Sequence, residues 1–138
     1  MAIWFDDYKL EHLQGFEKKS ILEQLGIVYT ELGEDFIKAK MVVDWRTHQP
    51  QGVLHGGASV VLAESLGSTA ANLVVDPNKQ YCVGLEVNAN HLRPASSGFV
   101  YGETRPIHLG KKTQVWEIKI TNEAGKMVCI SRLTMAVI

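Results

Sequence analysis

The segment from Gly56 to about Val75 is the feature that most constrains how this chain of 138 residues folds. Its apolar side chains recur most of the way around a helix, and the other positions are mainly alanine, serine, threonine and glycine. A helix that is apolar or small on nearly every side is a buried helix. Because proline cannot continue a helix, we expect it to end at the following Asp76-Pro77-Asn78. Other elements must therefore surround it.

Alternating patterns predict strands on both sides of this helix. Ile27–Leu32 and Phe36–Val43 flank Gly33-Glu34-Asp35, which has the composition of a hairpin turn. In the second strand, apolar residues alternate with lysines, as a sheet with one solvated face requires. Four further strands are expected over residues 81–92, 99–107, 114–121 and 127–137. Because sequential strands joined by short turns usually pair, we expect these four to form an antiparallel meander.

The remaining elements complete an α+β domain. Apolar side chains recur at helical spacing in about the first 25 residues, which predicts one or two short helices there. These positions are Leu10, Leu13, Phe16, Ile21, Leu22 and Leu25. No repeat or long linker divides the chain, so residues 1–138 are expected to form a single domain. Together these elements predict an antiparallel sheet of about six strands curled around one long central helix, an arrangement that periodicity alone does not assign to a named fold.

Composition and charge argue against several classes of partner. Hydrophobic residues make up 46% of the chain and charged residues 21%, the balance of an ordinary globular protein. A net charge of -1 argues against general nucleic-acid binding, so any anion must be recognised by a local cluster of basic residues. No apolar run approaches the roughly 20 residues that cross a bilayer, and the N-terminus lacks the apolar region of a signal peptide. We therefore expect a cytoplasmic protein without a membrane partner.

Cysteine and histidine patterns give no sign of a disulfide framework, a metal site or an organic cofactor. Cys82 and Cys129 are too few for such a framework and neither sits in a Cys-x-x-Cys pair, so two buried, reduced thiols are expected. The histidines have no short ligand spacing and form no His-Glu-x-x-His motif. There is also no Gly-x-Ser-x-Gly elbow and no phosphate-binding glycine loop.

Glu64 is the residue that most strongly indicates chemistry. It lies in the middle of the helix expected to be buried, and no lysine or arginine occurs between Arg46 and Lys79. Because desolvating an unpaired carboxylate costs several kcal/mol, such a residue needs a function, and a general base or a nucleophile fits. Ser68 follows one helical turn later and can hydrogen-bond the carboxylate or its water. The alternative is that Glu64 occupies a narrow exposed stripe and Ser68 is a small packing residue.

His55-Gly56-Gly57 opens the helix and has the properties of an anion site. Paired glycines permit close approach to the backbone, and the first-turn N–H groups and the helix dipole can bind a developing oxyanion. His55 can orient this helix tip or polarise a carbonyl. The alternative is a simple helix start, in which the glycines relieve crowding and the histidine is a cap.

The spacing of Gly56 and Glu64 predicts a site shared between two subunits. They are eight residues apart, or about 12 Å along a helix at ~1.5 Å per residue. One carbonyl group cannot contact both within the same chain. If both act on it, a two-fold dimer must bring Glu64 of one subunit beside Gly56 of the other. Self-association would also stabilise a domain of this small size.

Basic residues gather on the late strands. They are His91 and Arg93 at the end of one expected strand, and Arg105, His108, Lys111 and Lys112 around the next turn. In a nearly neutral protein this is the best local site for phosphate groups. The alternative is that they are solvated turn residues.

The stretch from Asp44 to Ser68, DWRTHQPQGVLHGGASVVLAESLGS, resembles the signature of the hotdog-fold acyl-CoA thioesterases. It is closest to the subgroup similar to 4-hydroxybenzoyl-CoA thioesterase with a helix glutamate, and the resemblance continues through VGLEVNANHLRP and RPIHLGKKTQVWEIKI. Within this subgroup the chain is most similar to bacterial enzymes acting on 1,4-dihydroxy-2-naphthoyl-CoA and to the proofreading thioesterase of aryl siderophore synthesis. The resemblance implies hydrolysis of an aryl- or acyl-CoA without a cofactor, a role in menaquinone biosynthesis, and homodimers paired into tetramers.

The resemblance also implies roles for individual residues. Glu64 is the catalytic carboxylate, either as nucleophile or as general base, and Ser68 orients it or its water. The N–H of Gly56 binds the carbonyl oxygen, with Gln49 and His55 in support. The residues implied to bind the nucleotide end of coenzyme A are His91, Arg93, His108, Gly110, Lys111 and Lys112.

Two alternatives to hydrolysis remain open at this level. One is an acyl-CoA hydratase or dehydratase on the same fold, and the other is a non-catalytic acyl-CoA-binding protein. If hydrolysis is correct, the substrate could also be an aryl group carried by a carrier protein. The acyl group itself depends on the packing of pocket side chains, which the sequence does not specify.

Overall fold

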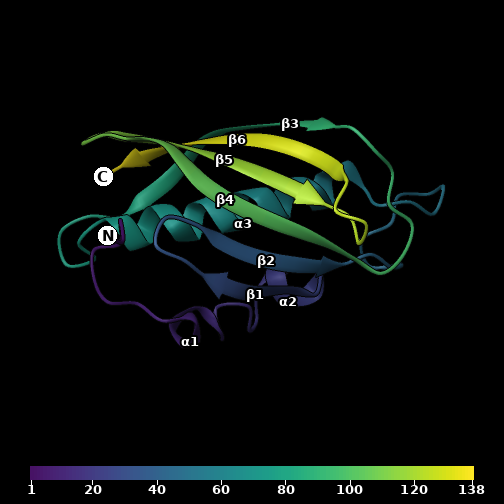
Figure 1. Cartoon of the computed structure of the whole chain (residues 1–138), viewed down its shortest axis with the longest axis horizontal. Helices are drawn as coiled ribbons and strands as arrows, with labels where there is room; N and C mark the ends of the chain where they lie inside the picture. Colours follow the sequence, from purple (N-terminus) through teal and green to yellow (C-terminus); the bar gives the residue numbers. More distant parts are fainter.

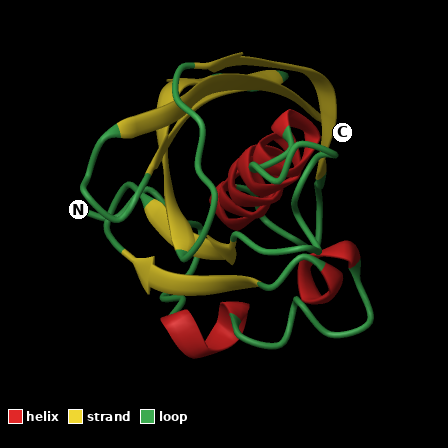
Figure 2. Ribbon diagram, turned by 90° about the vertical axis from the view of Figure 1, so that its right-hand side faces the viewer, coloured by secondary structure: helices red, strands yellow, loops and turns green.

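The computed structural model describes all 138 residues and consists of one six-stranded sheet curled around one long helix (Figures 1 and 2). The elements in chain order are α1 (Leu10–Leu13), α2 (Ile21–Gln24), β1 (Ile27–Leu32), β2 (Ile37–Val42), α3 (Gly56–Val74), β3 (Cys82–His91), β4 (Phe99–Leu109), β5 (Thr113–Thr121) and β6 (Met127–Val137). The sheet is antiparallel throughout, in the order β1-β2-β4-β5-β6-β3. The expected hotdog fold is confirmed.

Helix α3 runs through the middle of the curled sheet, as the view along the helix shows (Figure 2). Its apolar side chains Leu62 and Leu66 are completely buried. Two glycines allow the helix to lie this close to the strands. A methyl group on Gly67 would lie 2.5 Å from the side chain of Leu133, and one on Gly102 would lie 2.7 Å from that of Leu66. Since fully burying one leucine contributes ~1.5–3 kcal/mol, this packing is the main source of the fold's stability.

The first hairpin matches the expected pattern. Gly33 N donates to the carbonyl of Phe36 at 2.9 Å and closes the turn between β1 and β2. Along β2 the apolar residues Ile37, Ala39 and Met41 are buried, and the lysines between them are partly exposed. One face of the sheet therefore covers the helix and the other faces solvent.

The order of the last four strands differs from the expected meander. Strands β4, β5 and β6 do form one, but β3 pairs with β6 at the edge of the sheet, so that part of the prediction is wrong. The reason is the connection through residues 92–98, which crosses the end of the sheet (Figure 1). It is held there because Leu54 N donates to the carbonyl of Ala95 at 2.7 Å and a ring nitrogen of His48 contacts the carbonyl of Ser96 at 3.0 Å.

The N-terminal helices are one turn each and pack beside β1 (Figure 2). Of the six apolar residues whose spacing predicted these helices, only Leu13 is fully buried. Phe16 lies between the two helices and is 53% exposed, and Ile21 is 52% exposed. The helical pattern therefore failed for Phe16, because its segment is a turn between two very short helices.

Candidate active site

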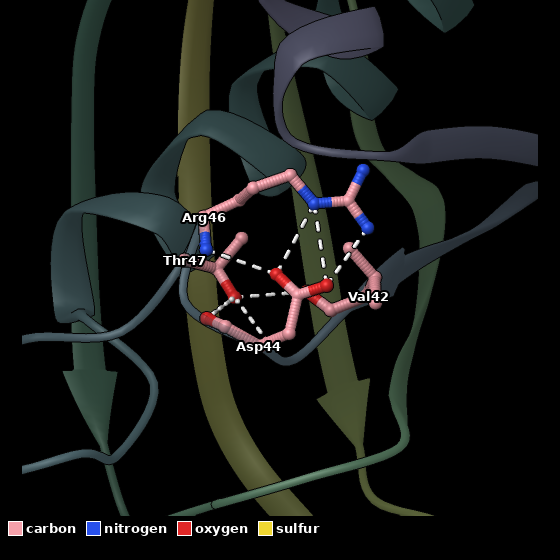
Figure 3. A network of polar contacts seen from close by, with 4 residues as sticks. All are labelled: Val42, Asp44, Arg46 and Thr47. Atoms are coloured by element: carbon pink, nitrogen blue, oxygen red, sulfur yellow. Dashed lines mark hydrogen bonds and ion pairs between the residues drawn. The ribbon is translucent and has the colours of Figure 1, made fainter.

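A polar network shapes the loop between β2 and α3 (Figure 3). The hydroxyl of Thr47 donates to the carbonyl of Val42 at 2.9 Å, and the Arg46 guanidinium donates to both carboxylate oxygens of Asp44 at 3.1 and 2.8 Å. The hydrogen bonds from Arg46 hold the pKa of the Asp44 carboxyl below its usual value. The carbonyl of Thr47 in turn accepts from His55 N at 2.8 Å, so the network fixes where α3 begins.

The first turn of α3 presents a free backbone donor. His55 is the N-cap, and its Nδ1 accepts from Gly57 N at 2.8 Å. Because Nδ1 is an acceptor, the proton of the neutral ring is on Nε2, which remains free to donate. The N–H groups of Ala58 and Ser59 both point to the carbonyl of His55, whereas the N–H of Gly56 makes no hydrogen bond within the chain. This free N–H lies at the positive end of the helix dipole and can bind a negatively polarised oxygen.

A cleft of about 360 Å³ opens beside this turn, between the start of α3 and the end of β3, and we call it the tip cleft. Gln49, Gly56, His91 and Arg93 line it, so the structure brings together four of the residues singled out in the sequence. The ring of His91 packs directly on Gly56, since a methyl group there would lie 2.8 Å from His91 Nε2. A larger residue at position 56 would have to displace this ring.

Two polar side chains of the tip cleft have hydrogen-bond donors that are not used within the chain. Arg93 uses one Nη1 proton on the carbonyl of Met127, at 3.0 Å, and has no carboxylate partner in the chain. The backbone of Gln49 is fixed by hydrogen bonds with Val53 and Gly52, at 2.8 and 2.9 Å. Its side-chain oxygen accepts from Gln51 N, which leaves the amide NH₂ group free.

Glu64 lies on the single polar stripe of α3. Glu64, Ser65, Ser68 and Thr69 are each partly exposed, whereas most of the rest of the helix is buried. With Phe16, Leu22 and Tyr29, these four residues line a shallow hollow of about 310 Å³, which we call the stripe groove. One side of the helix is therefore buried, and in the single chain Glu64 occupies the accessible stripe, which is the alternative that the sequence left open for this residue.

The carboxylate of Glu64 has no ion pair and no hydrogen bond within the chain. One of its oxygens rests against the edge strand β3, where a methyl group on Gly84 would lie 2.5 Å from Oε2. Glycine at this position therefore makes room for the carboxylate. The arrangement leaves Glu64 accessible for reaction and places it beside the free edge of the sheet.

Glu64 and Gly56 belong to two different hollows. The tip cleft contains Gly56 and the stripe groove contains Glu64 and Ser68, and no residue lines both. A single chain thus does not assemble the two parts on one reacting group, as the helix spacing indicates.

The basic residues are also divided. His91 and Arg93 line the tip cleft, but the turn between β4 and β5, with His108, Gly110 and Lys112, lies at the opposite end of the sheet (Figure 1). There Gly110 N donates to the carbonyl of Thr113 at 2.9 Å, and the carbonyl of Lys112 accepts from Val137 N at 2.9 Å. Lys111 and Lys112 are both exposed. Within one chain the structure does not bring these residues together.

Several residues that line the two hollows were missed in the sequence, and four of them bear on the site. Ser59 is 1% exposed and lines the tip cleft. It lies three residues after Gly56 on the same helix face, a spacing that could have revealed it. Phe16, Leu22 and Tyr29 line the stripe groove from the N-terminal part of the chain. No local signal links them to Glu64, because tertiary packing alone places them there.

Neither cysteine is in either hollow. Cys82 and Cys129 are free and buried, as expected, and burial raises the pKa of both thiols. No group of three or more histidine, cysteine or carboxylate side chains gathers in a way that could hold a metal ion. None of the helices combines the length and the hydropathy needed to cross a membrane.

Comparison with known proteins identifies the family. Residues 51–129, more than half of the chain, match the model of the thioesterase superfamily. A crystal structure of a thioesterase variant from Pseudomonas aeruginosa superimposes with a TM-score of 0.97, at 53% identity and with 99% of each chain covered. The chain belongs to the thioesterase superfamily and is a hydrolase of thioester bonds.

Two curated relatives are equally similar to this chain. A 1,4-dihydroxy-2-naphthoyl-CoA hydrolase from Escherichia coli is 48% identical, with 99% of each chain covered. A proofreading thioesterase from Cronobacter sakazakii is also 48% identical, with 99% of this chain and 98% of that protein covered. Hydrolysis therefore replaces the hydratase and binding-protein alternatives.

Proposed function

We propose that the protein hydrolyses aryl- or acyl-CoA thioesters to the free acid and coenzyme A, with Glu64 as the catalytic carboxylate. The observation that carries this proposal is the environment of Glu64, an accessible carboxylate without any partner within the chain, on the open stripe of a helix whose other side is buried. Because the carboxylate can be reached from the stripe groove and no partner within the chain holds it, it is free to act as a base or a nucleophile.

The helix tip supplies the second half of the reaction. The free N–H of Gly56 donates to the thioester carbonyl oxygen as it becomes negative, and the Gln49 amide supports it. Glu64 either removes a proton from a water that attacks the carbonyl carbon, or attacks this carbon itself and forms a mixed anhydride that a water then hydrolyses. Ser68 orients the water or the carboxylate. When the carbon–sulfur bond breaks, the Nε2 proton of His55 is available to the leaving thiolate.

Strand β3 provides the interface that joins the two halves. It is an edge strand of ten residues with one unpaired side, and Val83 and Leu85 on it are exposed. A long free edge of this kind is a template for pairing with another strand. We infer that β3 pairs antiparallel with β3 of a second subunit across a two-fold axis.

The positions of two residues on β3 define the register of this pairing. The ring of His91 packs on Gly56, so His91 is the residue of β3 that lies beside the helix tip. In the same way, Gly84 is the residue of β3 that lies beside Glu64. An antiparallel pair with its axis between Val87 and Asn88 sets Gly84 opposite His91 of the partner subunit. This register brings Glu64 beside the helix tip of the other chain and forms two equivalent sites per dimer.

The same two-fold axis accounts for the divided basic residues. It places the turn between β4 and β5 of one chain at the end of the sheet where the other chain has its tip cleft. His91 and Arg93 would then bind the phosphates of coenzyme A together with His108, Gly110, Lys111 and Lys112 of the partner subunit. We further propose that two dimers pair into a cytoplasmic tetramer, which native mass spectrometry can test.

For the acyl group, we propose 1,4-dihydroxy-2-naphthoyl-CoA as the first substrate to test, which would place the enzyme in menaquinone biosynthesis. The equal similarity to a proofreading thioesterase makes an aryl group on a carrier protein the competing substrate. Thiol release from matched aryl-CoA and aryl-carrier-protein substrates separates the two. A kcat/KM that is higher for the carrier protein would overturn the CoA assignment.

Mixed dimers test the composite site. Glu64→Ala and Gln49→Ala subunits, each nearly inactive alone, should recover about a quarter of wild-type activity when mixed, since half of the dimers then contain one intact site of two. The matched control mixes Glu64→Ala with Glu64→Gln, which can form no intact site. Equal activity in the two mixtures would contradict a shared site.

A further inference from the structure

Phe16 is a large apolar side chain in an unexpected position. It is 53% exposed, although it belongs to the apolar pattern of the N-terminal segment. One exposed aromatic residue is ordinary on a protein surface. Phe16, however, lines the stripe groove together with Glu64 and Ser68. The N-terminal segment thus contributes a wall to the hollow that contains the proposed catalytic carboxylate.

Glu64 is bordered differently on its two sides. On one side Gly84 and the free edge of β3 lie against the carboxylate, where the proposed dimer brings in the thioester. On the other side lie Phe16, Leu22 and Tyr29 of the N-terminal segment and β1. Given the proposed function, coenzyme A approaches from the β3 side, so the acyl group must extend toward Phe16.

The floor of the groove is polar and its outer wall is apolar. The hydroxyls of Ser65 and Ser68 make no hydrogen bond within the chain and face an accessible hollow. Tyr29 is held below them by a hydrogen bond of 2.7 Å between its hydroxyl and that of Thr69. A flat group in this groove can pack against the ring of Phe16, and ring stacking favours aromatic groups there.

We propose that Phe16 determines the acyl specificity of the enzyme by packing against planar, aromatic acyl groups. This inference rests on the proposed function, because it requires the reacting carbonyl to be at Glu64. It assigns the turn between α1 and α2 to substrate selection and not to the catalytic step, and it makes Phe16 a binding residue for the acyl group only.

The test compares benzoyl-CoA with hexanoyl-CoA in the full-length protein. For Phe16→Ala we expect kcat/KM for benzoyl-CoA to fall roughly tenfold, mainly through KM, and that for hexanoyl-CoA to change by less than about twofold. Phe16→Trp should keep the preference for benzoyl-CoA. Ile21→Ala is the matched control, because Ile21 is 52% exposed on the same segment but does not line the groove.

Several outcomes would overturn this inference. They are an equal loss on both substrates, no loss on benzoyl-CoA, or the same selectivity change in Ile21→Ala. A thermal unfolding scan of each variant excludes a general loss of folded protein. Glu64→Gln distinguishes the two proposals. If it keeps full activity, the proposed function fails. If it is inactive while Phe16→Ala leaves the ratio of kcat/KM values for benzoyl-CoA and hexanoyl-CoA unchanged, only the role of Phe16 fails.

Discussion

The tip cleft and the stripe groove differ in both chemistry and construction. The tip cleft offers donors and positive charge, from the N–H of Gly56, the Gln49 amide and Arg93. The stripe groove offers a carboxylate and hydroxyls, from Glu64 and Ser68. One hollow is suited to stabilise a negative oxygen and the other to create or position a nucleophile, so each lacks what the other has.

The two hollows also differ in how firmly they are held. The tip cleft is fixed by the Asp44–Arg46–Thr47 network and by the His55 cap. The stripe groove is bordered on one side by the turn that contains Phe16 and by the single-turn helix α2, which have little packing of their own. Catalysis requires preorganised donors, whereas an acyl pocket can vary. This difference favours a division in which the tip cleft performs the chemistry common to all substrates and the stripe groove selects the acyl group.

The largest effect is expected at the carboxylate. Glu64→Gln keeps the shape but removes the base or nucleophile, so kcat for thiol release should fall by roughly 10²–10⁴-fold with the thermal unfolding midpoint nearly unchanged. Glu11→Gln, an exposed carboxylate on α1, is the control and should behave as wild type. A Glu64→Gln enzyme with more than about a tenth of wild-type kcat would break the proposed division of roles.

A smaller effect is expected at the helix tip. Gln49→Ala removes a side-chain donor but leaves the N–H of Gly56 in place, so kcat should fall by about 10²-fold, the usual effect of removing one oxyanion donor. Gln51→Ala is a close control, since Gln51 is exposed two residues away and does not line the tip cleft. Similar kinetics for the two variants would remove Gln49 from the site.

The smallest effect is expected at the phosphate contacts. Arg93→Ala should raise KM about tenfold and leave kcat unchanged, because a phosphate contact contributes to binding and not to bond breaking. The difference from wild type should shrink as salt is raised, since Arg93 is exposed and its charge is screened. Arg132→Ala, on an exposed position of β6, is the control. A loss in kcat instead would move Arg93 into the catalytic step.

Much of the fold was predictable from local patterns. The bounds of α3 and of β1 and β6 agree closely with the expectations from hydrophobic periodicity and turn residues. These signals are local. A periodicity of two or 3.6 residues, or a proline that ends a helix, depends only on residues a few positions apart in the sequence. The separation of Gly56 from Glu64 is equally local, and it indicated a site shared between two chains.

What the sequence did not determine is which distant segments meet. Strand patterns do not specify their neighbours, so the pairing of β3 with β6 and not with β4 emerged only in the structure. That pairing sets Gly84 against Glu64 and His91 against Gly56. Tertiary packing likewise placed Phe16 in the groove of Glu64 and set the two groups of basic residues at opposite ends of the sheet. The local sequence thus determined the candidate reacting groups and their spacing along the helix, and the long-range packing decided what surrounds them.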